Sequence, residues 1–120
     1  MPKKILYIVT SGTDEPHRLY APFVLATTAR AMDIDATIYF LINGVMVMKQ
    51  GEAEKIQLGS FPPLKEVIDQ AIEAGVTLMA CDQSTQMLGL ERGGYLKECG
   101  VAGSATLNDL ALEADAILSF

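Results

Sequence analysis

Three continuous apolar runs, rich in β-branched and aromatic residues, occur at residues 4–10, 36–41 and 76–81. They do not alternate between apolar and polar residues, a pattern typical of strands buried on both faces of a parallel sheet. A fourth run occurs at residues 116–120, and a very short strand is predicted near Val101. Parallel strands need crossover connections, so the runs favour a fold with a helix between successive strands.

The segments between these runs carry helical patterns. Residues 17–32 and 62–75 are predicted helices, the second with apolar residues at the i, i+3, i+4, i+7 and i+8 positions. Shorter helices are predicted at residues 82–89 and 106–113. The alternation predicts a single α/β domain over residues 1–120. We expect a three-layer sandwich, Rossmann- or flavodoxin-like, with a mostly parallel sheet of four or five strands and helices on both faces.

The predicted helix at residues 17–32 is apolar over much more than one stripe. A helix of this kind is buried on two sides, and in a small domain a second subunit most easily covers the second side. Half of all residues in the chain are hydrophobic, which points the same way. The sequence therefore predicts a homo-oligomer.

Charge and hydropathy exclude several classes of partner. The formal net charge is -6, whereas a general nucleic-acid binder needs a basic face. The longest apolar stretch, residues 36–48, is interrupted by polar residues and is shorter than the ~20 residues of a membrane span. The N-terminal run is also too short for a signal-peptide core. We expect a cytoplasmic protein with no membrane partner, whose two cysteines are free thiols.

The chain has no common cofactor signature. It lacks the G-x-x-x-x-G-K-[ST] phosphate loop and the glycine spacing of a dinucleotide site, which disfavours a nucleotide-binding flavodoxin-like protein. Neither cysteine belongs to a Cys-x-x-Cys pair and His17 is the only histidine, so we expect no metal and no organic cofactor. His17 stays a candidate for lining a site, because it would be needed for any Cys–His pairing.

Cys81 is the main candidate functional residue. It ends the third apolar run and directly precedes a polar segment that reads as the first turn of a helix. Ligands bind outside the carboxyl ends of the strands in open α/β sheets. The free backbone N–H groups of a helix start also favour a thiolate, which is the nucleophilic form of cysteine. The alternative is a cysteine buried for structural reasons only.

Neighbouring residues complete the candidate set. Asp82, Gln83 and Ser84 follow Cys81 and could line the site, although the charge of Asp82 opposes thiolate formation. Cys99 lies in a polar segment, so we expect it to be exposed. If a crossover returns it to the same end of the sheet, Cys99 could serve as a resolving or relay thiol.

The segment LMACDQSTQMLGL at residues 78–90 resembles the cysteine motif of the DsrE/DsrF-like (TusD-like) sulfur-relay proteins, in which a strand-end Ala-Cys leads into a short helix closed by Met-x-Gly. The order and spacing of further segments extend the resemblance over essentially the whole chain. These are residues 13–19 with Pro22 and Phe23, residues 39–45 with 49–51, and residues 107–120.

The resemblance implies a small α/β domain that assembles into dimers, trimers or hexamers. It implies that Cys81 carries sulfane sulfur, as a persulfide or a thiosulfonate, and passes it to a partner thiol. Cys99 falls near a second cysteine of some thiosulfate-carrying relatives. The implied partners are sulfur donor and acceptor proteins or small sulfur compounds. Such a protein is a sulfurtransferase-like carrier rather than a self-contained enzyme. The alternative is a small-ligand or partner-binding α/β oligomer in which Cys81 is purely structural.

Overall fold

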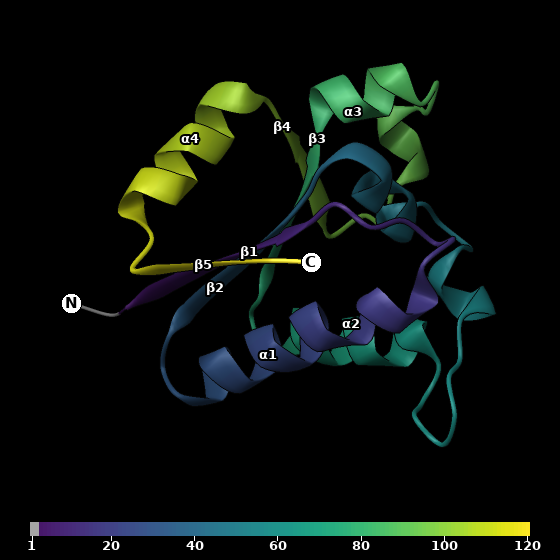
Figure 1. Ribbon diagram of the computed structural model, residues 1–120, viewed down its shortest axis with the longest axis horizontal. Helices are drawn as coiled ribbons and strands as arrows, with labels where there is room; N and C mark the ends of the chain where they lie inside the picture. The colour runs from purple at the N-terminus through teal and green to yellow at the C-terminus, as the bar shows by residue number, and fades with distance from the viewer. Residues whose placement is uncertain (1–2) are drawn as a thin grey trace.

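A five-stranded parallel sheet forms the centre of the protein in the computed structural model, which describes residues 3–120 (Figure 1). The first two residues of the predicted 1–120 domain lie outside the described residues. All strand pairs are parallel, and the sheet order is β4-β3-β2-β1-β5, as expected for a chain of crossover connections. The strands are β1 (Lys4–Val9), β2 (Asp35–Phe40), β3 (Thr77–Cys81), β4 (Cys99–Ala102) and β5 (Ala116–Ser119).

Helices lie on both sides of this sheet, which confirms the predicted three-layer α/β fold (Figure 1). Helices α1 (Tyr20–Ala31) and α2 (Leu64–Glu73) cover one face, and α4 (Ser104–Glu113) lies over the other. The short α3 (Asp82–Met87) follows β3 directly at the carboxyl edge. The longest of these helices has 12 residues, so no helix of the described part of the chain could span a bilayer.

The two faces of the sheet are covered to different extents. The face toward α1 and α2 holds the main core, where Phe23 of α1 stacks on Phe40 of β2 with ring centroids 5.9 Å apart. By contrast, no residue of α4 is buried, and every residue of the edge strand β5 is exposed. The packed core therefore lies between the sheet and the helices α1 and α2. Helix α4 covers the opposite face without burying any of its own residues.

The first and last helices begin elsewhere than predicted. Pro16–Arg18 forms a separate 3-10 turn, so the helix predicted from residue 17 begins at Tyr20. The last helix begins at Ser104, two residues before the predicted start. In α1, Val24 and Leu25 are 40% and 41% exposed, so the second apolar side of this helix is open in the single chain.

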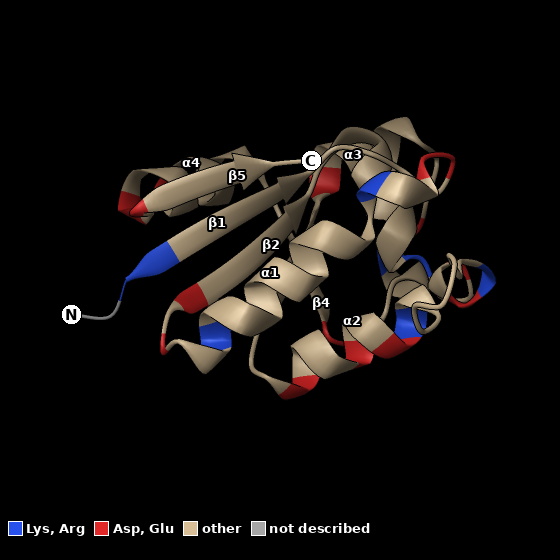
Figure 2. Cartoon of the chain, turned by 60° about the horizontal axis from the view of Figure 1, so that its bottom comes forward, with Lys and Arg blue, Asp and Glu red and all other residues tan. Residues whose placement is uncertain are grey.

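Charged residues are also distributed unevenly. Figure 2 shows that α1 and β5 contain almost no charged residues, whereas acidic and basic residues both occur along α2. The uncharged surface of α1 and β5 is the part of the molecule whose composition is most like that of a subunit contact.

The loops that follow β1 and β2 pack tightly against each other at the carboxyl edge. Gly44 lies directly against the backbone of Val9, where a Cβ would overlap the Val9 carbonyl. Gly12 is similarly close to Asn43. These glycines allow the two loops to come together beside the end of β3, where Cys81 lies.

Candidate functional site

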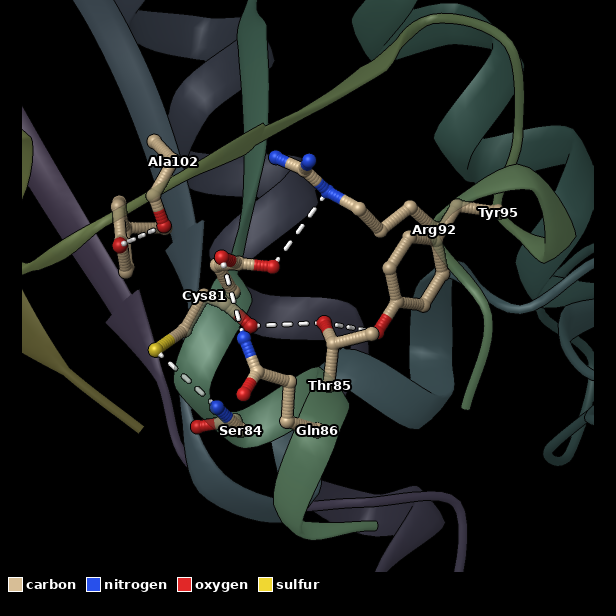
Figure 3. Close-up of polar contacts among 9 residues, drawn as sticks. Cys81, Ser84, Thr85, Gln86, Arg92, Tyr95 and Ala102 are labelled. Carbon is tan, nitrogen blue, oxygen red and sulfur yellow. Dashed lines mark hydrogen bonds and ion pairs between the residues drawn. The ribbon is translucent and has the colours of Figure 1, made fainter. Parts of the chain in front are cut away.

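Cys81 ends β3 and caps the N-terminus of α3, which confirms the strand-to-helix junction predicted from the sequence. Its Sγ accepts a hydrogen bond from the backbone N–H of Ser84 at 3.4 Å (Figure 3). This is the geometry of a side-chain N-cap, with sulfur in place of the usual oxygen. A backbone donor at a helix start stabilises a thiolate more than a thiol. The side chain is nonetheless buried, with 3% of its surface exposed.

A chain of buried hydroxyls holds the backbone of Cys81 in place (Figure 3). Thr85 Oγ1 donates to the Cys81 carbonyl at 2.7 Å and lies 2.6 Å from Tyr95 Oη. Since the Thr85 proton is already used, Tyr95 is the donor of the second bond. Burial raises the pKa of Tyr95, which keeps its hydroxyl protonated in this role.

Ser84 connects the cysteine helix to the loop that follows β2. Its Oγ accepts a hydrogen bond from the backbone N–H of Ile42 at 2.8 Å. Ile42 has a φ of 58°, a left-handed conformation that is unfavourable for a β-branched residue. The backbone N–H of Ser84 thus contacts the sulfur of Cys81, and its hydroxyl bonds to the strained Ile42, while its role in a site stays a prediction.

Tyr39 of β2 is a neighbour of Cys81 that the sequence did not single out. It is fully buried, and its Oη donates to the carbonyl of Ala102 at 2.9 Å, with the Gly103 carbonyl 3.2 Å away. Ala102 is the register partner of Cys81 on β4 (Figure 3). Burial, together with the nearby charge of Cys81, raises the pKa of Tyr39 to about 12.

Asp82, the residue whose charge opposes a thiolate, is itself paired. Arg92 Nε lies 3.4 Å from Asp82 Oδ1, and Gln86 Nε2 donates to Oδ2 at 3.4 Å (Figure 3). The Arg92 side chain is 65% exposed, so solvent screens this ion pair strongly. The pairing offsets part of the repulsion between Asp82 and a charged sulfur.

Gln83 lies at the surface near the start of α3 and connects this helix to α4. Ser104 Oγ, at the start of α4, donates to Gln83 Oε1 at 3.1 Å. The bond links the start of α3 to the start of α4.

The prediction that Cys99 is exposed is wrong. Only 8% of its surface is accessible, and burial raises the pKa of its thiol to about 12. Cys99 also begins β4, whereas Cys81 ends β3, so the two do not share a sheet end. Polar neighbours suggested exposure, but Lys97 and Glu98 lie outside the strand and point to solvent while Cys99 turns inward.

His17 lies exposed in the 3-10 turn after β1. Strand β2 separates β1 from β3 in the sheet, so His17 and Cys81 follow strands that are not neighbours, and a site-lining role of His17 stays a prediction. Among residues 3–120, no three His, Cys, Asp or Glu side chains gather closely enough to hold a metal ion.

A cavity of about 250 Å³ lies at the other end of the sheet, between α4 and the first residues of the strands. Two ion pairs line it, Lys4 with Glu113 at 3.5 Å and Arg30 with Asp35 at 3.2 Å. Their charges are already paired and the cavity is remote from Cys81, so we place the candidate site at the cysteine.

Fold and site together define a small parallel α/β protein with a cysteine at the carboxyl edge of its sheet. The chain belongs to the DsrE/DsrF-like family, whose model matches residues 3–120, and this confirms the resemblance seen in the sequence.

Two similar sequences are uncharacterized proteins of Methanocaldococcus jannaschii. MJ0760 is 25% identical over 103 residues, which cover 86% of this chain and 38% of the relative. The chain thus spans well under half the length of MJ0760. MJ0989 is 26% identical over 117 residues, which cover 98% of this chain and 99% of the relative.

Two solved structures share the fold over their full lengths. The ychN protein of E. coli aligns with a TM-score of 0.80 at 16% identity, covering 100% of both chains. MTH1491 of Methanobacterium thermoautotrophicum, a protein of unknown function, aligns with a TM-score of 0.71 at 14% identity, again covering 100% of both. At these identities the likeness concerns the fold alone.

Proposed function

We propose that the protein is a sulfur-relay carrier that holds sulfane sulfur on Cys81, as a persulfide or thiosulfonate, and passes it to a partner thiol. The observation that carries this proposal is the N-cap geometry of Cys81, whose Sγ accepts the Ser84 N–H at 3.4 Å. Membership of the DsrE/DsrF-like family supports the same reading. The protein acts here as a carrier rather than as a self-contained enzyme.

The chemistry needs only the cysteine and two sulfur compounds. The Cys81 thiolate attacks the outer sulfur of a donor such as thiosulfate, a new S–S bond forms, and sulfite leaves with the electron pair of the broken bond. The anionic persulfide then lies beside the N–H groups at the start of α3. An acceptor thiolate attacks the outer sulfur, and Cys81 leaves as a thiolate, which restores the starting state.

The burial of Cys81 favours a second candidate, a ligand- or partner-binding oligomer in which this cysteine is structural. With 3% of its surface exposed, Cys81 requires a local opening before any donor can reach the sulfur. The two candidates differ in one measurable property, the reactivity of Cys81 in the native protein.

Intact-mass measurement after treatment with thiosulfate, polysulfide or a persulfide donor distinguishes them. A carrier gains the mass of added sulfur atoms as a persulfide, or of a sulfur–oxygen group as a thiosulfonate. The gain disappears in Cys81→Ser and remains in the matched variant Cys99→Ala. If the wild-type protein gains no mass, or if Cys81→Ser gains as much as the wild type, the carrier proposal is rejected and Cys81 has a structural role.

We also propose that the protein works in the cytoplasm as a homo-oligomer, together with sulfur donors and acceptors that are proteins or small compounds. Both cysteines are free, which suits a reducing compartment. Large apolar side chains lie exposed on α1 and β5, where a second copy would cover them.

A further inference from the structure

We propose that Tyr39 is a positioning residue for Cys81, whose hydroxyl turns from the backbone carbonyls of β4 to the sulfur when the sulfur becomes anionic. This inference rests on the proposed function, because it assigns Tyr39 the task of holding the charged carrier sulfur. Under this proposal the charged sulfur has two hydrogen-bond donors. One is the Ser84 N–H, which already contacts Sγ, and the other is the hydroxyl of Tyr39 on the neighbouring strand β2.

The register of the sheet brings the two side chains together. Tyr39 pairs with Met79 on β3, and Cys81 follows two residues later, so Tyr39 and Cys81 belong to the same face. The Oη of Tyr39 reaches the carbonyl of Ala102 at 2.9 Å, and Ala102 is itself the register partner of Cys81. The hydroxyl thus lies between the end of β3 and the end of β4.

The hydroxyl has one proton and three neighbouring acceptors. In the present arrangement the proton goes to the carbonyl of Ala102, and the Gly103 carbonyl at 3.2 Å is a second acceptor. The third is the sulfur of Cys81, which lies on the same face of the sheet as Tyr39 and on the register partner of Ala102, and whose charge raises the pKa of Tyr39. Rotation about the C–O bond changes the acceptor without moving the buried ring.

The charge of the sulfur decides which acceptor is preferred. A hydrogen bond to an anion is roughly twice as strong as one between neutral groups, and burial strengthens it further. A neutral thiol leaves the proton on Ala102, whereas a thiolate or persulfide anion attracts it. Because the pKa of Tyr39 is raised to about 12, the phenol keeps its proton at neutral and mildly alkaline pH. Tyr39 is therefore a donor and not a base.

The exchange also affects the cover of the site. Ala102 and Gly103 lead into α4, and the next residue, Ser104, bonds to Gln83 of α3. When the Tyr39 proton moves to sulfur, this turn loses its bond to β2. Charging the sulfur therefore weakens the connection between β2 and the segment that joins β4 to α4.

Tyr39→Phe tests the proposal, because it removes the hydroxyl and keeps the ring. The matched control is Tyr7→Phe. Tyr7 is a buried tyrosine of β1 on the opposite face of the sheet, and its hydroxyl donates to the Leu25 carbonyl at 3.3 Å. All variants carry Cys99→Ala, and the rate of Cys81 alkylation by iodoacetamide is measured against pH.

We expect Tyr39→Phe to move the alkylation profile upward by about one pH unit and to slow the reaction about tenfold at neutral pH, as the loss of one hydrogen bond to a charged group predicts. Tyr7→Phe should leave the profile in place. Coinciding profiles for wild type and Tyr39→Phe, or equal shifts in both variants, overturn the proposal.

Uniform incorporation of 3-fluorotyrosine provides a test that does not depend on the folding of Tyr39→Phe. A more acidic phenol is a stronger donor, so the profile should move to lower pH, and an unchanged profile contradicts the role of Tyr39. The outcomes also separate this inference from the proposed function. Sulfur loading of Cys81 with no effect of Tyr39 refutes only the inference, whereas a wild-type Cys81 that neither loads nor alkylates refutes both.

Discussion

Cys81 and Cys99 lie on neighbouring parallel strands but belong to opposite faces of the sheet. Cys81 pairs with Ala102 and Cys99 pairs with Leu78, so the cysteines are three rows out of register. An odd number of rows places side chains on opposite faces, and three rows correspond to about 10 Å along the strand. A disulfide needs Cα atoms within about 7 Å, so the two sulfurs of one chain cannot exchange directly without rearrangement of the sheet.

From this relationship we predict that sulfur loading is independent of Cys99. Cys99→Ala should gain the same sulfur mass as the wild type at the same rate, and native alkylation should modify Cys81 and spare Cys99. Peptide mapping after a short iodoacetamide pulse measures both. A loading defect in Cys99→Ala, or a Cys81–Cys99 disulfide formed during turnover in the folded protein, would contradict the prediction.

Alkaline pH should destabilise the protein through Cys99. Burial raises the pKa of this thiol from 9.0 to about 12, so between these values the unfolded chain loses the proton while the folded chain keeps it. The unfolded state then binds fewer protons, and the free energy of unfolding falls as pH rises from about 9 toward 12, by at most about 1.4 kcal/mol per unit. Urea unfolding midpoints at several pH values should fall less steeply for Cys99→Ala. If the midpoints of wild type and Cys99→Ala fall equally steeply with pH, Cys99 ionises equally in the folded and unfolded states.

The hydroxyl chain behind Cys81 should contribute measurably to stability. Thr85→Val keeps the side-chain shape but leaves the Tyr95 hydroxyl buried without its partner, at a cost of about 2 kcal/mol. Thr27→Val is the matched control, because Thr27 also donates to the carbonyl four residues before it, at 2.8 Å, but serves no second hydroxyl. We expect it to cost less than about 1 kcal/mol by urea unfolding. Equal costs would mean that Tyr95 gains nothing from Thr85.

The sheet and the position of Cys81 can be predicted from the sequence because both depend on local patterns. The apolar runs at residues 36–41 and 76–81 are long and uninterrupted, and an apolar residue followed by Asp82 marks a strand end and a helix start. The DsrE/DsrF-like motif adds the same information by resemblance. These features need no knowledge of which strands pair.

The surroundings of Cys81 are harder to predict because they depend on register. Tyr39 reads as one more apolar strand residue, and its bond to Ala102 joins residues 63 apart in the sequence. The Thr85–Tyr95 contact, whose two hydroxyls are 2.6 Å apart, likewise depends on how the segment after α3 folds back. The burial of Cys99 is hidden in the sequence because its charged neighbours Lys97 and Glu98 precede β4, and the start of this short strand cannot be read from the local pattern.

The exposed edge of the sheet predicts where self-association occurs. Strand β5 is an edge strand without charged residues, and Ile117 and Leu118 are 46% and 42% exposed. Edge strands of this kind pair with or pack against other chains unless charge prevents it. We therefore expect Leu118→Lys to shift the protein toward monomer in sedimentation velocity at micromolar concentration. The control Gln70→Lys adds the same charge at an exposed position of α2 and should leave the oligomer unchanged. A monomeric wild type, or an equal effect of both variants, would show that β5 is not the contact.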